Sequence, residues 1–204
     1  MCSSALILLA ALSWAPARDG AAHTPPAPAA KSAPAASPAR AALPTRDEAL
    51  ALLCPGARWI QETLYPTSEQ LAKATELAGE KVESRVLVRH AAYVDGKLAL
   101  LAYFDTHRVR SLGETLLVAL EPGGRVRRVE VVAFAEPRDY LPREKFYAQL
   151  AGRELDKELR LDRGVQSVAG ATLTARATVA ATRRVLALQR ALPAPAASQP
   201  TPAK

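Results

Sequence analysis

The chain has 204 residues, of which 49% are hydrophobic and 23% charged, and its formal net charge is +7. This length gives room for one domain with appendages, and a positive charge raises nucleic acid as a partner class. Only 5% of the residues are aromatic, and the arginines of segment 125–132 alternate with valines as on the solvated face of a sheet. We therefore interpret the charge as an arginine-rich surface and expect no nucleic acid partner.

Residues 1–17 have the pattern of a signal peptide. An apolar run covers residues 5–14, and the following Ala-Pro-Ala has the small-x-small pattern of a cleavage site. Roughly ten apolar residues are too few to span a bilayer, which needs about twenty. The segment predicts export, to the periplasm or to a membrane-associated position facing it.

Segments rich in proline and alanine flank one continuous region of mixed periodicity. Residues 18–44 predict a disordered linker and residues 193–204 a disordered tail. Between them, residues 45–192 predict a single domain. Removal of the signal peptide would leave Cys54 as the one cysteine, which excludes an intramolecular disulfide in the mature chain.

The first half of this domain contains two capping boxes and a hairpin signal. Thr-x-x-Glu at residues 45–48 and Thr-x-x-Gln at residues 67–70 predict helices over 46–53 and 68–78. Asp95-Gly96 separates two apolar, β-favouring runs, which predicts a hairpin.

A second hairpin is predicted around the turn at residues 121–124, which contains Pro122 and two glycines. Residues 141–152 then predict a short helix. We expect an α+β fold in which two hairpins form a four-stranded antiparallel sheet packed with helices.

The last helix is predicted from its apolar stripe. From Thr174 onward, apolar residues recur at three- and four-residue steps, and the arginines lie mostly off the stripe. Gly170 and Ala171 precede this helix and are small enough to let another group approach its free amides. The spacing leaves two alternatives open: Thr172 or Thr174 caps the helix, or the helix entrance binds an anion such as phosphate.

Segment 165–177, VQSVAGATLTARA, resembles the flavinylation motif of the FMN-binding domain family. This family includes flavinylated components of the sodium-pumping NADH:quinone reductase and of the Rnf electron-transport complex. In the family, FMN is esterified through its phosphate to the threonine that follows Gly-Ala, and a flavin transferase makes the bond outside the cytoplasm. The resemblance extends over about residues 84–190 and implies that Thr172 is the attachment residue.

The resemblance implies a cofactor site around the Gly-Ala-Thr turn. Gly170 and Ala171 would lie at the FMN phosphate. The flavin ring would need apolar walls and a few polar contacts. The candidate walls are Pro137, Tyr140 and Leu173, and the candidate polar contacts are Arg108, Glu136 and Thr174.

Two positions depart from the family pattern. Gln166 stands where the family favours Asp, and Ala169 stands where it has Ser or Thr. Covalent FMN, non-covalent FMN and a degenerate site are therefore all retained as alternatives.

The sequence contains no hydrolytic constellation. Its three histidines are scattered, and no Cys, His and Asp cluster has metal-ligand spacing. A redox carrier that is loaded by a flavin transferase and exchanges electrons with membrane or periplasmic proteins is favoured over an enzyme with its own substrate. The alternative is a cofactor-free binding or assembly module.

Overall fold

The computed structural model describes residues 42–195. The predicted signal peptide 1–17 lies outside these residues, as do most of the predicted linker 18–44 and tail 193–204. The fold is α+β, as predicted: an antiparallel sheet packs against helices. The elements in chain order are α1 (Arg46–Leu53), β1 (Arg58–Leu64), α2 (Ser68–Ala78), β2 (Leu87–Val94), β3 (Lys97–Arg108), β4 (Gly113–Leu120), β5 (Val126–Phe134), the 3₁₀ helix η1 (Arg138–Tyr140), α3 (Glu144–Ala148) and α4 (Thr172–Ala191).

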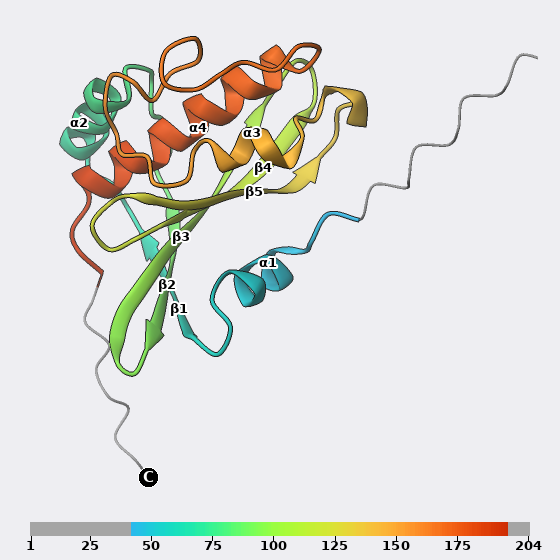
Figure 1. Ribbon diagram of the computed structural model, residues 1–204. Helices are drawn as coiled ribbons and strands as arrows, with labels where there is room; N and C mark the ends of the chain where they lie inside the picture. The colour runs from blue at the N-terminus through green and yellow to red at the C-terminus, as the bar shows by residue number, and fades with distance from the viewer. Residues whose placement is uncertain (1–41, 196–204) are drawn as a thin grey trace, which may run out of the picture. The chain divides into compact units, whose positions relative to one another are not determined.

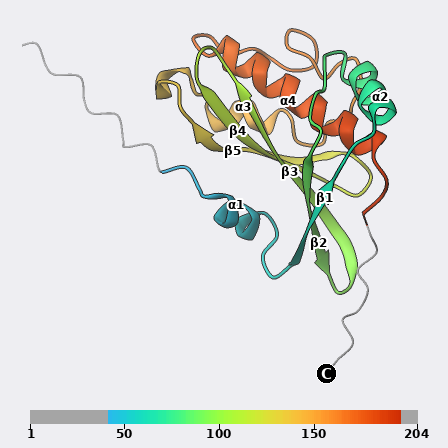
Figure 2. The same ribbon diagram turned by 180° about the vertical axis from the view of Figure 1, so that it is seen from behind.

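The sheet has five strands in the order β1-β2-β3-β4-β5, so every strand pairs with its neighbours in the chain. Helices α2 and α4 pack against one another on one face, whereas α1 lies on the other face (Figures 1 and 2). The larger core lies between the sheet and α4 and includes the fully buried Leu101, Leu116 and Val118. A smaller core joins Leu50 of α1 to Leu117 of β4.

The local signals for the first helices and for the hairpins are confirmed. The hydroxyls of Thr45 and Thr67 accept hydrogen bonds from the amides three residues later, so α1 and α2 begin where the capping boxes predict. Asp95 and Gly96 form the turn between β2 and β3 with φ angles of 50° and 73°. Gly124 closes the predicted turn between β4 and β5 with φ 81°.

Two parts of the fold differ from the sequence prediction. The sheet has a fifth strand, β1, which pairs with β2 across the intervening α2 and therefore has no hairpin turn to reveal it. The predicted helix 141–152 is α-helical only over Glu144–Ala148. Beyond it the chain tightens, because the amides of Gln149, Leu150 and Ala151 each donate to the carbonyl three residues earlier.

Helix α4 follows the predicted stripe but buries one arginine. It begins at Thr172, two residues before the predicted stripe, and Ala181, Val185 and Leu188 are buried as expected. Arg183, expected off the stripe, is only 7% exposed. Its guanidinium donates to the carbonyl of Ala78 at the end of α2, which explains why a cation is tolerated there.

Candidate functional site

The entrance of α4 is an open turn followed by an exposed threonine. Gly170 has φ +80°, and no atom lies within 4 Å of the position that a Cβ would take there. Ala171 occupies the N-cap position, and Thr172 is the first helical residue. The Thr172 side chain is exposed, and its hydroxyl donates to the carbonyl of Val168 at 3.2 Å.

Neither threonine caps the helix. The N-cap residue is Ala171, and no side chain accepts a hydrogen bond from the first turn of α4. The first amide that joins the helical pattern is that of Ala175, which donates to the carbonyl of Ala171. The capping alternative is therefore wrong. The amides of Thr172, Leu173 and Thr174 have no acceptor within the helix, as is usual for the first turn, and can donate to another group.

Thr174 holds the helix entrance to a neighbouring segment. Thr174 is only 1% exposed, and its hydroxyl donates to the carbonyl of Tyr140 at 2.7 Å. The hydroxyl proton of Thr174 is used in this internal bond, and its polar contact with a flavin stays a prediction. The 3₁₀ helix η1 is thereby attached to the first turn of α4, and the two lie at the same end of the fold (Figure 1).

Glu136 is also engaged inside the protein. One of its carboxylate oxygens accepts from the amides of Ser111 and Leu112, both at 2.8 Å, and from that of Arg110 at 3.2 Å. These bonds lower the pKa of Glu136, with the Leu112 and Ser111 amides contributing most. Glu136 thus holds the turn between β3 and β4, and its contact with a flavin stays a prediction.

Arg110, which the sequence analysis did not select, contacts the Tyr140 ring. The guanidinium carbon of Arg110 lies 4.8 Å from the centroid of the Tyr140 ring, a cation–π distance. Arg108 ends β3 with its side chain exposed. Arg110 lies in the turn between β3 and β4, where the alternation of a strand does not apply, so the sequence pattern did not indicate it.

Apolar side chains remain exposed at this end of the fold. Leu173 in the first turn of α4 is 46% exposed, as is Leu112 in the turn that Glu136 binds. Pro137 is exposed and Tyr140 half-buried. The structure therefore brings Leu173 and Tyr140 to one region, and it adds Leu112, which the sequence analysis did not select.

A glutamine bridge fixes the segment that leads to the turn. The side-chain oxygen of Gln149, just after α3, accepts from the amide of Gln166 at 2.9 Å. The side-chain nitrogen of Gln149 donates to the carbonyl of Gln166 at 3.4 Å. The Gln166 side chain is exposed and takes part in neither bond.

A charged network missed by the sequence analysis lies between the sheet and α4. The two ring nitrogens of His107 lie 2.8 Å from a carboxylate oxygen of Asp105 and 3.1 Å from one of Glu114. Asp105 also pairs with Arg184 of α4 at 2.8 Å. Burial opposes the charge on His107, but the bonds to both carboxylates outweigh it and raise its pKa to about 9. Asp105 and His107 are two positions apart in β3, so the alternation of side chains places them on one face of the sheet. This spacing was the signal in the sequence that could have indicated the network.

Two cavities lie along α4 beyond its entrance. Their volumes are about 440 and 300 Å³, and both are lined by Arg160 and Arg183. Neither is lined by any residue from 166 to 174. The Gly-Ala-Thr turn is thus a surface site, separate from these cavities.

Comparison with models of known protein families and with curated proteins gives no match to this sequence. None of the helices in residues 42–195 combines the length and the apolar character that crossing a membrane requires.

Proposed function

We propose that this protein binds FMN at the entrance of α4 and carries electrons between membrane or periplasmic partners. The observation that supports the proposal most directly is the position of Thr172. It is exposed at the first residue of a 20-residue helix whose entrance no side chain caps. The alternative in which this turn is only a threonine helix cap is no longer supported, because neither threonine makes the bond.

The residues around the turn fit a phosphate ester. The open approach beside Gly170 lets a bulky group come close to the backbone. The unused amides of the first turn, at the positive end of the helix dipole, are suited to the two free oxygens of a phosphodiester. Each charge-assisted hydrogen bond of this kind contributes roughly 1.5 to 3 kcal/mol.

The surroundings of the turn fit a ring that lies on the surface. Leu173 and Leu112 offer exposed apolar area, and the Tyr140 ring carries Arg110 on one face. Bound FMN would supply reversible one- or two-electron chemistry. The protein's contribution would be to hold its phosphate and to limit the contact of the ring with water.

Covalent loading through Thr172 would be a phosphoryl-type transfer from FAD. The hydroxyl oxygen of Thr172 forms a bond to the phosphorus of the FMN half, and the bond between the two phosphates of FAD breaks. AMP leaves, and the hydroxyl proton passes to a base. The first turn of α4 offers no acidic side chain as this base, so the flavin transferase would supply it.

The proposal is tested by co-expressing the full chain with a flavin transferase in an exporting host and measuring the intact mass after denaturation. We expect an added mass equal to FMN less water, which is retained in Thr172→Ser and lost in Thr172→Ala. Thr63→Ala, which alters an exposed threonine of β1, serves as the matched control and should keep the added mass.

The other outcomes are equally informative. FMN that copurifies with the native protein but is released by denaturation would contradict covalent attachment and retain the binding site. Purified protein without flavin in either form would overturn the proposed function and favour a cofactor-free module.

A further inference from the structure

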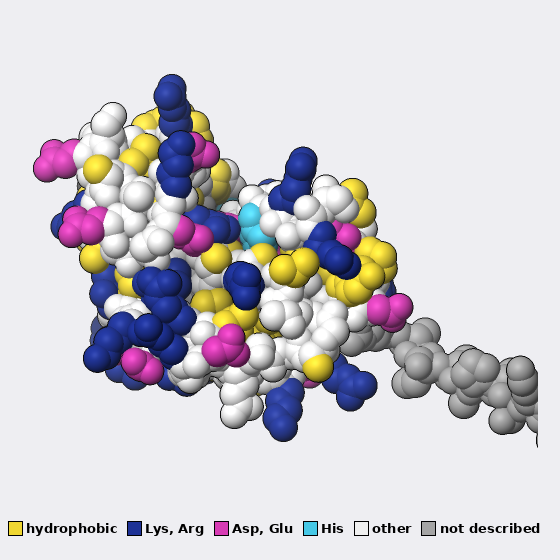
Figure 3. Space-filling model, turned by 90° about the horizontal axis from the view of Figure 1, so that it is seen from above, with side chains coloured by type: hydrophobic (Ala, Val, Ile, Leu, Met, Phe, Trp, Pro, Cys, Tyr) yellow, Lys and Arg dark blue, Asp and Glu magenta, His cyan; other side chains and the backbone are white. Residues whose placement is uncertain are grey.

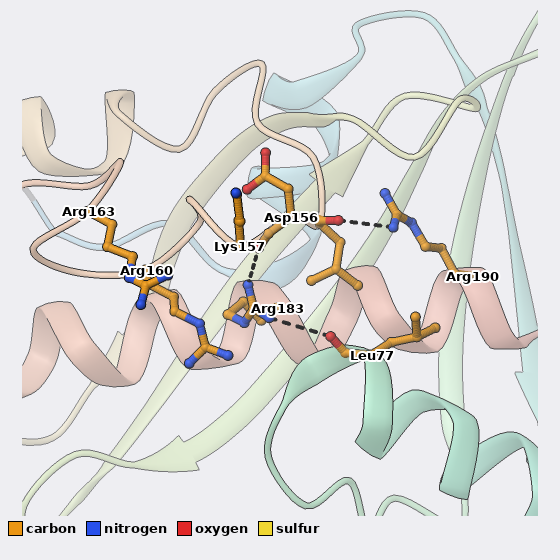
Figure 4. A pocket seen from close by; sticks show the side chains of 8 residues that line it. Leu77, Asp156, Lys157, Arg160, Arg163, Arg183 and Arg190 are labelled. Atoms are coloured by element: carbon orange, nitrogen blue, oxygen red, sulfur yellow. Dashed lines mark hydrogen bonds between the residues drawn. The ribbon is translucent and has the colours of Figure 1, made fainter.

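The larger cavity is lined by three segments, and two of them, the loop before α4 and α4 itself, contribute cationic side chains. It has a volume of about 440 Å³, and Figure 4 shows how α2, the loop before α4 and α4 itself contribute to it. Lysine and arginine side chains also gather in one group on the left of the face shown in Figure 3. The residues that line the cavity are Leu77, Leu155, Asp156, Lys157, Arg160, Arg163, Arg183 and Arg190.

Three exposed cations of this cavity lack acidic partners in the described chain. Within residues 42–195, none of Lys157, Arg160 and Arg163 forms an ion pair with a carboxylate. Arg184 of α4 differs from these three residues, because it forms ion pairs with both Glu80 and Asp105. The positive charge around the cavity is therefore a local excess.

The one carboxylate in the lining is already engaged. Asp156 accepts hydrogen bonds from the amides of Glu158 and Leu159, both at 2.8 Å, and so holds the loop in place. Its main-chain carbonyl accepts from Arg183 at 2.6 Å. Asp156 thus organises the cavity wall, and its single negative charge offsets one of the five cations that line the cavity.

Arg183 forms a buried base for the cavity. The residue is 7% exposed, and its guanidinium donates to carbonyls of α2 and of the loop, but to no carboxylate in the described chain. Burial and the nearby Arg160 lower its pKa. The carbonyl groups hold this guanidinium in place, so Arg183 contributes a fixed positive charge at the base of the cavity, which attracts an anion.

We propose that this cavity binds a small anion that carries two linked phosphate groups, such as the diphosphate of a nucleotide. Arginine forks match phosphate oxygens in geometry, and the cavity lies within the usual size range for small-molecule sites, about 300 to 1,000 Å³. Five cations and one carboxylate line the cavity, so a phosphate monoester with about 1.5 to 2 negative charges would leave about half of the net positive charge unmatched. Leu77 and Leu155 add an apolar wall that suits an organic group attached to the diphosphate.

The proposal is tested by titration calorimetry of the full chain with inorganic pyrophosphate and with ADP at about 50 mM salt, where electrostatic screening is modest. We expect saturable binding of ADP with one site per chain. Tighter binding of ADP than of pyrophosphate would assign the apolar wall to the organic group. Equal binding would identify the diphosphate alone as the ligand.

Two double variants separate the cavity from general electrostatics. Lys157→Ala/Arg163→Ala removes two cavity cations, and Lys97→Ala/Arg127→Ala removes two exposed cations elsewhere. We expect the first to weaken ADP binding at least about tenfold, which one lost charge-assisted bond suffices to cause, and the second to change it less than about twofold. Similar weakening by both, or no saturation with either ligand at about 1 mM, would overturn the proposal.

This site is independent of the proposed flavin site. The Thr172→Ala chain should bind ADP as the unaltered chain does, because Thr172 does not line the cavity. Loss of ADP binding in that variant would contradict a separate site. Failure to find flavin would leave the expected ADP titration unchanged.

Discussion

The hydroxyl of Thr174 donates to the carbonyl oxygen of Tyr140 at 2.7 Å and joins the start of α4 to η1. The two residues are 34 positions apart, so the bond fixes the geometry of a site whose parts come from distant segments. The bond holds the main chain at Tyr140, whose ring is in contact with the guanidinium of Arg110.

Replacing Thr174 by Val should therefore lower the free energy of unfolding by about 1 to 2 kcal/mol, because a buried carbonyl loses its donor. The measurement is urea denaturation. The matched control is Thr178→Val one turn later, where the buried hydroxyl has no hydrogen-bond partner among the described residues. That change should be neutral or stabilising, and equal destabilisation by both variants would contradict a specific role for the Thr174 bond.

Glu136→Gln should loosen the turn between β3 and β4. The carboxylate accepts from three consecutive amides, and its pKa lies below the ordinary value of 4.5. A lowered pKa gives a stability contribution that is present above pH 4.5 and is lost as the pH falls through the folded value. Hydrogen exchange at the amides of Arg110, Ser111 and Leu112 should accelerate in the variant at neutral pH. The free energy of unfolding of the variant should also change less than that of the wild type as the pH is lowered. Unchanged exchange at these amides would exclude the proposed role of the carboxylate.

Two glycines in the segment that leads to α4 should respond differently to a methyl group. Gly170→Ala places a side chain at φ +80° but in open space, so a cost of about 1 to 2 kcal/mol is expected. Gly164→Ala would bring a Cβ to 2.5 Å from the carbonyl oxygen of Glu158, and the loop would have to move. Thermal denaturation should rank Gly164→Ala as the more destabilising variant, and the reverse order would contradict the loop geometry.

The network around His107 should make stability depend on alkaline pH. Its pKa is about 9 in the folded protein and near 6.5 when unperturbed. A raised pKa gives a contribution that is fully present below pH 6.5 and is lost as the pH rises to about 9, with an upper bound of about 3 kcal/mol. The free energy of unfolding of the wild type should fall over this window relative to that of His107→Gln. Parallel curves for the two proteins would show that the histidine is not charged.

The sequence predicts the elements whose signals are local. Thr45 and Thr67 sit in capping boxes, and Asp95-Gly96 forms a turn, because each of these signals depends on residues within one helical turn or hairpin. The strand β1 was missed because its partner β2 comes only after α2. No local pattern records that pairing.

The sequence predicted the open turn before α4, but it did not predict the hydrogen bonds of the side chains around that turn. The small residues before Thr172 indicated an open helix entrance, which depends on side-chain size alone. The partners of Glu136 and Thr174 lie 24 to 34 positions away, so spacing could not reveal that both groups are already hydrogen-bonded. The burial of Arg183 likewise depends on carbonyls from α2 and from a distant loop.

The neighbour-to-neighbour order of the sheet has a consequence for how the chain is made. All strand pairings can form before α4 leaves the ribosome, since β5 ends at Phe134 and α4 begins at Thr172. Until then, the apolar face that α4 covers has only α2, α3 and solvent over it. A nascent chain stalled before α4 would therefore present an apolar surface to chaperones or to other chains, until this 20-residue helix is made and covers it.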